Sequence, residues 1–181
     1  HGVLNTDNMT VTGDSFDYGP FRFVPRFDSG FVAAYFDHSG LYAFGRQPHV
    51  VSWNMDRLAD ALRPLAPTAP LGAAAACFDD RYEAALTART LARLGVAPRD
   101  PPTDLALSGA TWSFLESTSS GFEPVFFDLY GGKARDGRAA RGPASDHYRG
   151  RRWTDLHDLV SRYDPRSPGS AGDPYFQCDA P

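Results

Sequence analysis

The clearest hydrophobic pattern of the chain follows Pro48. Apolar side chains recur at the i, i+4, i+7 and i+11 positions of one helix face: Val51, Met55, Leu58 and Leu62. Pro64 cannot continue such a helix, because it lacks a backbone N–H and clashes with the preceding turn. The pattern predicts an amphipathic helix from about residue 51 to Pro64, and we expect Trp53 to pack in the core.

Further helices are predicted downstream, at residues 74–94, 104–117, 123–130 and 153–163. Gly95 and the pair Gly131-Gly132 provide the ends that helices prefer. The proline-rich segments 64–73 and 100–103 are predicted to be linkers. Phe126 and Phe127 are expected in the core.

Residues 20–50 are rich in aromatic side chains, glycine and proline, without helical spacing. They predict an extended, packed loop with a turn at Asp37-His38-Ser39-Gly40. Arg46 has two alternative roles at this stage. It contacts a phosphate or a substrate, or it pairs with a carboxylate.

Polar side chains gather in the first twenty residues, where Asp7, Asn8 and Asp17 alternate with apolar positions. Gly13-Asp14 supplies a turn signal, so this stretch predicts a loop, a short hairpin and a second loop. In that hairpin, Asn8 and Asp17 lie at neighbouring ends of paired strands, and their side-chain oxygens are able to converge.

Convergent oxygens suit a hard divalent cation. Mg²⁺ takes few protein ligands and lends its charge to phosphate oxygens, so Asn8 and Asp17 form a candidate magnesium site. Asp7 remains as a second carboxylate that orients or deprotonates a hydroxyl nucleophile. The alternative is local structure, since Asp and Asn in turns commonly form caps or Asx-turns.

Composition and charge narrow the function classes. The chain has 181 residues, 42% hydrophobic content and a formal net charge of −4, which is typical of a soluble globular domain. No apolar run reaches membrane-spanning length, and no signal peptide is visible. Cys77 and Cys178 define neither a disulfide framework nor a metal-binding spacing.

The segment 133–152 is basic. It lacks the interleaved aromatic residues expected for nucleic-acid binding, and the whole chain is acidic. We therefore expect a solvated loop, with docking of a protein substrate as the alternative, and neither a nucleic acid nor a membrane as a partner.

Several motifs together resemble the selenoprotein O family, also called the YdiU family. They are His-Gly-Val-Leu-Asn-Thr-Asp-Asn-Met at residues 1–9, Asp-Tyr-Gly-Pro-Phe at 17–21, Tyr-Ala-Phe-Gly-Arg-Gln-Pro at 42–48, Trp53-Asn54 and Phe-Phe-Asp-Leu-Tyr-Gly-Gly at 126–132. The late Pro174-Tyr175-Phe176 is similar as well. The resemblance covers nearly the whole chain and is strongest over residues 1–60.

The resemblance implies a protein-kinase-like fold that transfers AMP from ATP to Ser, Thr or Tyr hydroxyls of proteins. By position, Asp7 is the proton acceptor, Asn8 and Asp17 are ligands of Mg²⁺ (or Mn²⁺), and Asp17 also neighbours ATP. One departure concerns Val3, because small-molecule kinases with a His-Gly-Asp motif place their base there. Two alternatives remain: ordinary phosphoryl transfer, which uses the same metal ligands, and a catalytically silent pseudokinase that only binds nucleotide, which Val3 supports.

The expected fold class is α+β and mostly helical: the C-terminal lobe of a kinase-like fold with a catalytic-loop hairpin. Residues 1–163 are expected to be a partial catalytic domain that lacks its N-terminal lobe, because no Gly-rich loop or strand lysine precedes His1, and 164–181 a Pro/Gly/Ser-rich tail. We expect the fragment to be inactive alone, Cys178 not to be the family's redox residue, and a cytoplasmic location in bacteria or a mitochondrial one in eukaryotes.

Overall fold

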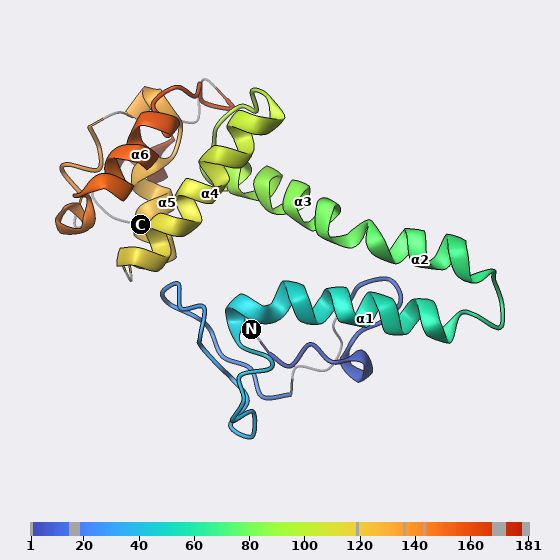
Figure 1. Cartoon of the computed structure of the whole chain (residues 1–181). Helices are drawn as coiled ribbons and strands as arrows, with labels where there is room; N and C mark the ends of the chain where they lie inside the picture. Colours follow the sequence, from blue (N-terminus) through green and yellow to red (C-terminus); the bar gives the residue numbers. More distant parts are fainter. Residues whose placement is uncertain are drawn as a thin grey trace. The chain divides into compact units, whose positions relative to one another are not determined.

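The computed structural model describes residues 2–14, 19–118, 120–135, 137–142, 144–167 and 173–178. These residues are mostly helical, as predicted (Figure 1). The α-helices are α1 Gln47–Ala61, α2 Thr68–Ala76, α3 Phe78–Arg93, α4 Pro101–Thr118, α5 Phe122–Leu129 and α6 Arg151–Val160. Short 3-10 helices are η1 Thr6–Asn8, η2 Phe44–Arg46, η3 Gly132–Arg135, η4 Ser145–His147 and η6 Pro174–Gln177. No described helix is long and apolar enough to cross a bilayer.

The chain divides into two compact units, which are described separately. Unit 1 comprises residues 1–24 and 28–83, and unit 2 comprises residues 25–27 and 84–181. Helix α3 begins in unit 1 and ends in unit 2. Isolated β-bridges join Arg26 to Gly121 and Val96 to Pro165, both within unit 2.

In unit 1, α1 and α2 pack against each other and are joined by residues 62–67 (Figure 1). Helix α1 confirms the amphipathic prediction and starts earlier than expected, because Pro48 fits the first helical turn. The predicted linker at 64–73 is wrong from Thr68 onward. Pro70 lies in the first turn of α2, where its missing N–H costs little, and the alanines after it favour helix.

The expectation that Trp53 packs in the core is wrong. Its side chain is 51% exposed, whereas Val50 and Asn54 are the buried positions of α1. Trp53 lies outside the apolar stripe of the helix. The Arg57 guanidinium, one turn further along, lies over its ring at 5.1 Å from the ring centre.

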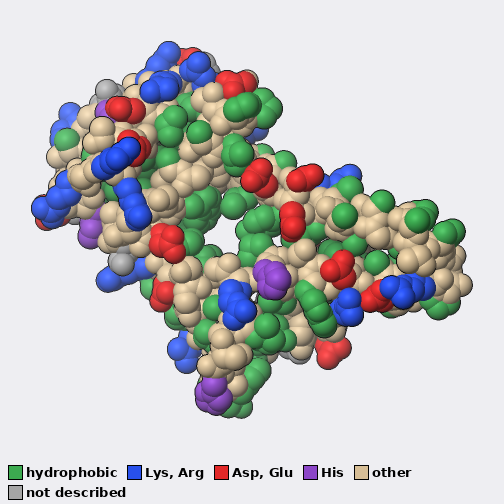
Figure 2. Space-filling view, viewed as in Figure 1, with side chains coloured by type: hydrophobic (Ala, Val, Ile, Leu, Met, Phe, Trp, Pro, Cys, Tyr) green, Lys and Arg blue, Asp and Glu red, His purple; other side chains and the backbone are tan. Residues whose placement is uncertain are grey.

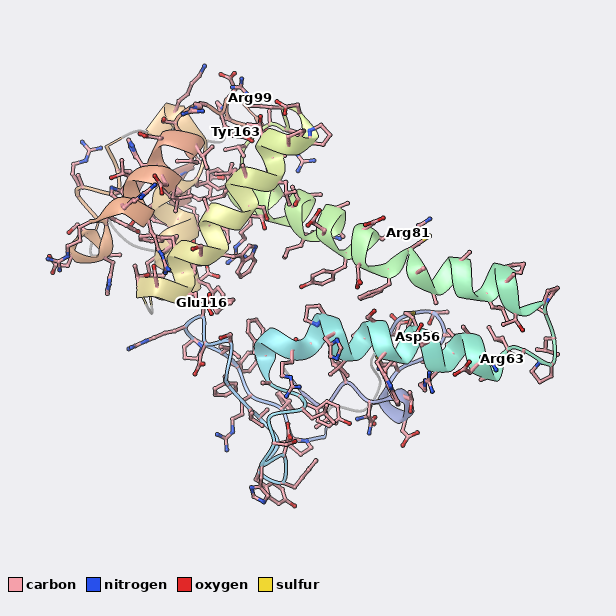
Figure 3. All side chains as sticks on the ribbon, in the orientation of Figure 1. Asp56, Arg63, Arg81, Arg99, Glu116 and Tyr163 are labelled. Carbon is pink, nitrogen blue, oxygen red and sulfur yellow. The ribbon has the colours of Figure 1, made fainter. Side chains whose placement is uncertain are left out.

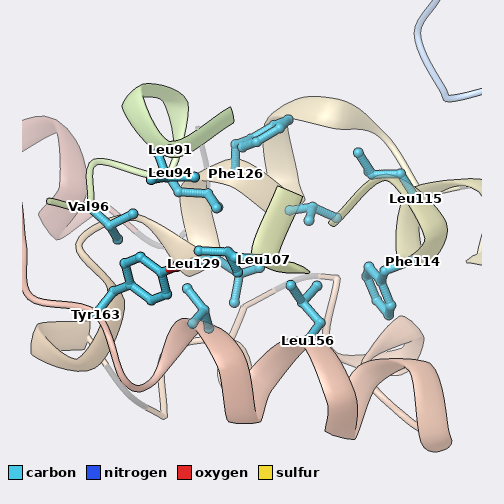
Figure 4. Close-up of a cluster of buried hydrophobic side chains, with 12 residues drawn as sticks. Leu91, Leu94, Val96, Leu107, Phe114, Leu115, Phe126, Leu129, Leu156 and Tyr163 are labelled. Atoms are coloured by element: carbon cyan, nitrogen blue, oxygen red, sulfur yellow. The ribbon is translucent and has the colours of Figure 1, made fainter. Parts of the chain in front are cut away.

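Unit 2 is built around a closed apolar core in which α4 packs on α6 (Figure 4). The fully buried members include Leu94, Leu107, Phe114, Leu115, Leu156 and Tyr163. Fully burying one such side chain contributes about 1.5–3 kcal/mol. Phe126 and Phe127 are buried, which confirms their predicted place in the core.

Helix α4 includes residues that the sequence predicted as a linker. The Asp100 carboxylate accepts the backbone N–H of Thr103 at 3.0 Å, and Pro101 begins the helix. Because the first turn of a helix needs no N–H from proline, the Pro101-Pro102 pair starts a helix here instead of preventing one.

A buried carboxylate ties the start of α4 to the segment that follows α6. The Tyr163 hydroxyl donates to Asp104 Oδ1 at 2.8 Å, and the backbone N–H of Arg99 donates to the same oxygen at 3.1 Å. The Arg99 guanidinium lies 5.7 Å from the centre of the Tyr163 ring (Figure 3). Burial, followed by the hydrogen bond to Asp104 and the charge of that carboxylate, raises the pKa of Tyr163.

The basic segment 133–152 is more structured than the predicted solvated loop. Arg138 is only 12% exposed at its side chain, and its Nε lies 3.6 Å from Oδ1 of the buried Asp128. Lys133 pairs with Asp164 at 2.6 Å. Figure 2 shows Lys and Arg side chains interspersed with acidic ones on the visible face of this unit, so the segment's positive charge is partly neutralised by its own unit.

We expect Tyr163→Phe to lower the free energy of unfolding of the chain by about 1.5–3 kcal/mol, the usual contribution of a hydrogen bond to a charged group. Urea denaturation at pH 7 measures the loss. Tyr82→Phe is the matched control, since Tyr82 is 38% exposed and no hydrogen bond of its hydroxyl is found among the described residues. Equal stability of the Tyr163→Phe variant and the unaltered chain would refute a stabilising role for the Tyr163 hydroxyl.

The same bond predicts a pH dependence in the alkaline range. A tyrosine whose pKa is raised by folding stabilises the native state fully below its unfolded pKa of about 10, and that contribution is lost as the pH rises through the folded value. The stability difference between the unaltered chain and Tyr163→Phe should therefore shrink above pH 10.

In unit 1, the hydrogen bonds of Asp37 predict a contribution to stability with the opposite pH dependence. Its carboxylate accepts the backbone N–H groups of Leu41 at 2.9 Å and Tyr42 at 2.8 Å. Desolvation opposes ionisation, but these bonds and the Ser39 hydroxyl together hold the pKa of Asp37 below its usual value. Its stabilising contribution is therefore present above the unfolded pKa of about 3.9 and lost as the pH falls through the folded value.

Asp37→Asn should lower the thermal midpoint modestly at pH 7, because an amide nitrogen cannot accept an N–H. The difference should disappear as the pH is lowered towards 2. Differential scanning calorimetry across this pH range measures both effects, and a difference that stays constant with pH would contradict the assigned role of the carboxylate.

Candidate functional site

The candidate site lies in the 3-10 turn η1, which carries two of the predicted site residues. Asp7 is exposed and Asn8 is half-buried. The Asn8 backbone N–H donates to the Asn5 carbonyl at 3.2 Å, which closes the turn. The Asn8 side-chain Nδ2 donates to the Val3 carbonyl at 3.0 Å. The amide nitrogen is thus engaged with the backbone, and the amide oxygen is the end that remains for a ligand.

A single side chain from α1 contacts the chain on both sides of this turn. Asn54 Nδ2 donates to the Leu4 carbonyl at 2.8 Å and lies 3.4 Å from the Met9 sulfur. Asn54 is only 4% exposed. The sequence placed Asn54 in a motif but assigned it no role, although a polar residue four positions after the apolar Val50 was a signal that it faces the interior.

The predicted turn after the site is present. The Thr10 N–H donates to the Asp14 carbonyl at 2.9 Å, and Gly13 has a φ of 89°, a conformation that glycine adopts without strain. Asp17 lies outside the described residues, as does the strand expected to hold it. The hairpin, and the convergence of Asn8 with Asp17, therefore stay predictions.

Val3 occupies the position at which small-molecule kinases carry a base. Its side chain is buried at 9% exposure, and its carbonyl accepts the Asn8 amide. A carboxylate at this position would be withdrawn from water, which disfavours its ionised form. The exposed Asp7 is better placed to receive a proton from a hydroxyl group in solution.

The oxygen atoms near η1 suit a magnesium ion that keeps most of its water ligands. In the described part of the chain, no three His, Cys, Asp or Glu side chains gather in a group that could hold a metal. Mg²⁺ nevertheless needs only one or two protein oxygens beside water and phosphate. The orientation of Asn8, with nitrogen on the backbone and oxygen remaining, fits that limited demand.

The turn and α1 together line a cavity of about 600 Å³ within unit 1. Its walls include Thr6, Met9 and Val11 from residues 2–14, and Trp53 and Asn54 from α1. This cavity explains why Trp53 is exposed: its ring faces the open space beside the turn instead of the packed interior of unit 1.

Among the described residues, Arg46 pairs with no carboxylate. Its guanidinium Nη1 donates to the Gly40 carbonyl at 3.2 Å. Together with the Asp37 hydrogen bonds, this contact closes the turn at 37–42. Contact of Arg46 with a phosphate or substrate remains a prediction.

Comparisons with known proteins agree with the family resemblance that the motifs of the first twenty residues indicate. The profile of the family described as "Protein adenylyltransferase SelO" matches residues 1–155. A protein nucleotidyltransferase YdiU from Gloeobacter violaceus is 48% identical over 126 residues, which are 70% of this chain and 26% of the relative. Proteins of the same name from Synechocystis sp. and Trichormus variabilis are 40% and 37% identical over 71% of this chain, and over 28% and 27% of their own lengths.

The chain spans about a quarter of the length of these curated relatives. The family match includes the η1 turn, the buried Asn54 and the whole of α1 to α5. This chain therefore belongs to the SelO family of protein adenylyltransferases.

Proposed function

We propose that this chain supplies part of the catalytic centre of a protein adenylyltransferase, which transfers AMP from ATP to Ser, Thr or Tyr hydroxyls of proteins. Membership of the SelO family supports nucleotidyl transfer. The observation that carries the assignment to this segment is the Asn8 amide. Its nitrogen donates to the Val3 carbonyl, which leaves its oxygen as the end available to a cation, and the neighbouring residue Asp7 is exposed.

In this proposal, Asn8 and Asp17 hold Mg²⁺ or Mn²⁺, and Asp17 also neighbours ATP. A divalent cation at this position supplies neutralisation of phosphate charge and alignment of the reacting groups. Asp7 accepts the proton of the substrate hydroxyl. The hydroxyl oxygen forms a bond to the α-phosphorus, and the bond between that phosphorus and the oxygen leading to the β-phosphate breaks, which releases pyrophosphate.

The kinase-like fold fits the mostly helical character of the described residues, and we propose the chain as part of its C-terminal lobe. The domain limits predicted above, residues 1–163 with a tail at 164–181, belong to the same proposal. Described tail residues pack on the rest of unit 2, since the Phe176 ring stacks on the Tyr130 ring with ring centres 3.8 Å apart. The partners in this proposal are ATP and a protein with an accessible hydroxyl.

Phosphoryl transfer is the second candidate, and it uses the same metal ligands with attack at the γ-phosphorus. A catalytically silent module is the third candidate, and the buried Val3 is the feature that favours it. The three candidates differ in which phosphate, if any, becomes attached to protein.

Radiolabelled ATP distinguishes the candidates directly. A full-length protein that carries this chain, incubated with a protein substrate and MgCl₂, should retain label on protein from [α-³²P]ATP and not from [γ-³²P]ATP. Retention of the γ label would show phosphoryl transfer. Absence of both labels would support the silent module.

Asp17→Ala in the same full-length protein should reduce AMP transfer by at least about 100-fold, since it removes a ligand of the ion that neutralises the reacting phosphates. Asp79→Ala is the matched control, because Asp79 is an exposed carboxylate in the first turn of α3. The assignment of Asp17 would be wrong if both variants kept the activity of the unaltered protein.

A further inference from the structure

We infer that Asn54 is a positioning residue for the proposed metal ligand Asn8, acting from α1 through the backbone of the loop. The inference rests on the proposed function, because it concerns how the same site is held. In this view, a helix residue some 45 positions away from Asn8 fixes the orientation of that candidate ligand.

The two contacts of the Asn54 amide nitrogen, the Leu4 carbonyl and the Met9 sulfur, lie on opposite sides of η1 along the chain. A carbonyl is a strong acceptor and a thioether a weak one, so the Leu4 contact dominates. One side chain thus holds the loop before and after the turn that carries Asp7 and Asn8.

Two hydrogen bonds at consecutive carbonyls link α1 to the candidate ligand. Asn54 fixes the Leu4 carbonyl, and the neighbouring carbonyl, that of Val3, accepts the Asn8 side chain. Because the two carbonyls belong to consecutive residues, a shift of Leu4 moves the acceptor that orients the Asn8 amide. The Asn8 oxygen then loses its preferred direction.

The Asn54 amide carries an energetic cost. Asn54 is 4% exposed, and its Oδ1 is buried with no hydrogen-bond partner among the described residues. An unsatisfied buried polar atom costs about 1–3 kcal/mol. Since an apolar residue would avoid that cost, packing alone does not account for an amide at this position. The donor bond to Leu4 does account for it.

The test measures binding of Mn²⁺ itself, independently of turnover. Electron paramagnetic resonance reports free Mn²⁺ as it is titrated into the full-length protein with a non-hydrolysable ATP analogue. Asn54→Leu should weaken Mn²⁺ binding by about 10-fold or more, the usual effect of losing a residue that orients a metal ligand. AMP transfer at limiting Mn²⁺ should fall in parallel.

Thr111→Val is the control for a merely structural effect. Thr111 is fully buried in unit 2, and its hydroxyl donates to the Leu107 carbonyl at 2.8 Å. This variant should lower the thermal midpoint and leave the Mn²⁺ affinity unchanged. If Asn54→Leu does not fold, Asn54→Ser carries the test, because its side chain is too short to reach Leu4.

The outcomes separate the two proposals. Weaker Mn²⁺ binding by the Asn54 variant, with the control unaffected, supports the positioning role. Unchanged Mn²⁺ binding in a folded Asn54 variant overturns that role and leaves the proposed function intact. Failure of the unaltered protein to bind Mn²⁺ with the analogue overturns the proposed metal site, and the positioning role with it.

Discussion

The hydrogen bond from Asn54 to the Leu4 carbonyl is the interaction on which the candidate site depends. Apart from the short turn η1, residues 2–14 have no regular helix to hold them. A loop of this kind keeps its shape only when its polar backbone groups find fixed partners. Here the fixed partner comes from α1, the longest regular element that belongs wholly to unit 1.

The two units are stabilised in different ways. Unit 2 closes a core of leucine, valine and aromatic side chains, and the Asp104–Tyr163 hydrogen bond joins its segments. Among the described residues of unit 1, only Val3, Ala33, Ala34, Ala43 and Val50 are buried apolar positions. Their small side chains bury little area. Unit 1 therefore relies more on side-chain hydrogen bonds to backbone, from Asn8, Asp37, Arg46 and Asn54.

This difference is consistent with the proposed location of the site in unit 1. A site that must admit ATP, a metal ion and a protein hydroxyl needs polar groups near solvent, and such groups are found on segments of lower packing density. The exposed Asp7 and the cavity beside η1 show that arrangement in unit 1.

Helical periodicity and stop signals allowed much of the fold to be predicted. The stripe from Val51 to Leu62 and the helix end at Gly131 depend on local rules, and both agree with the structure. The prediction of proline-rich linkers was wrong in part, because proline breaks the interior of a helix but fits its first turn. Pro64 follows the end of α1, whereas Pro70 lies in the first turn of α2, so proline accompanies a helix end at one position and a helix start at the other.

The sequence proposes residue types for the site, but it does not reveal how the site is supported. The prediction that Asn8 and Asp17 hold a phosphate-binding cation, with Asp7 as the proton acceptor, rests on local chemistry and on family resemblance. The bond between Asn54 and Leu4 spans 50 positions, and no local pattern encodes such a contact. Trp53 was misplaced for a related reason, since its surroundings depend on the loop that packs beside α1.

The most direct test of the account is a crystal structure of a full-length protein carrying this chain, grown with Mn²⁺ and a non-hydrolysable ATP analogue. We predict an anomalous Mn²⁺ peak bonded to the Asn8 amide oxygen and an Asp17 carboxylate oxygen, with Asn54 still bound to Leu4. A Mn²⁺ peak elsewhere, with the Asn8 oxygen turned away from both the ion and the nucleotide, would contradict the account.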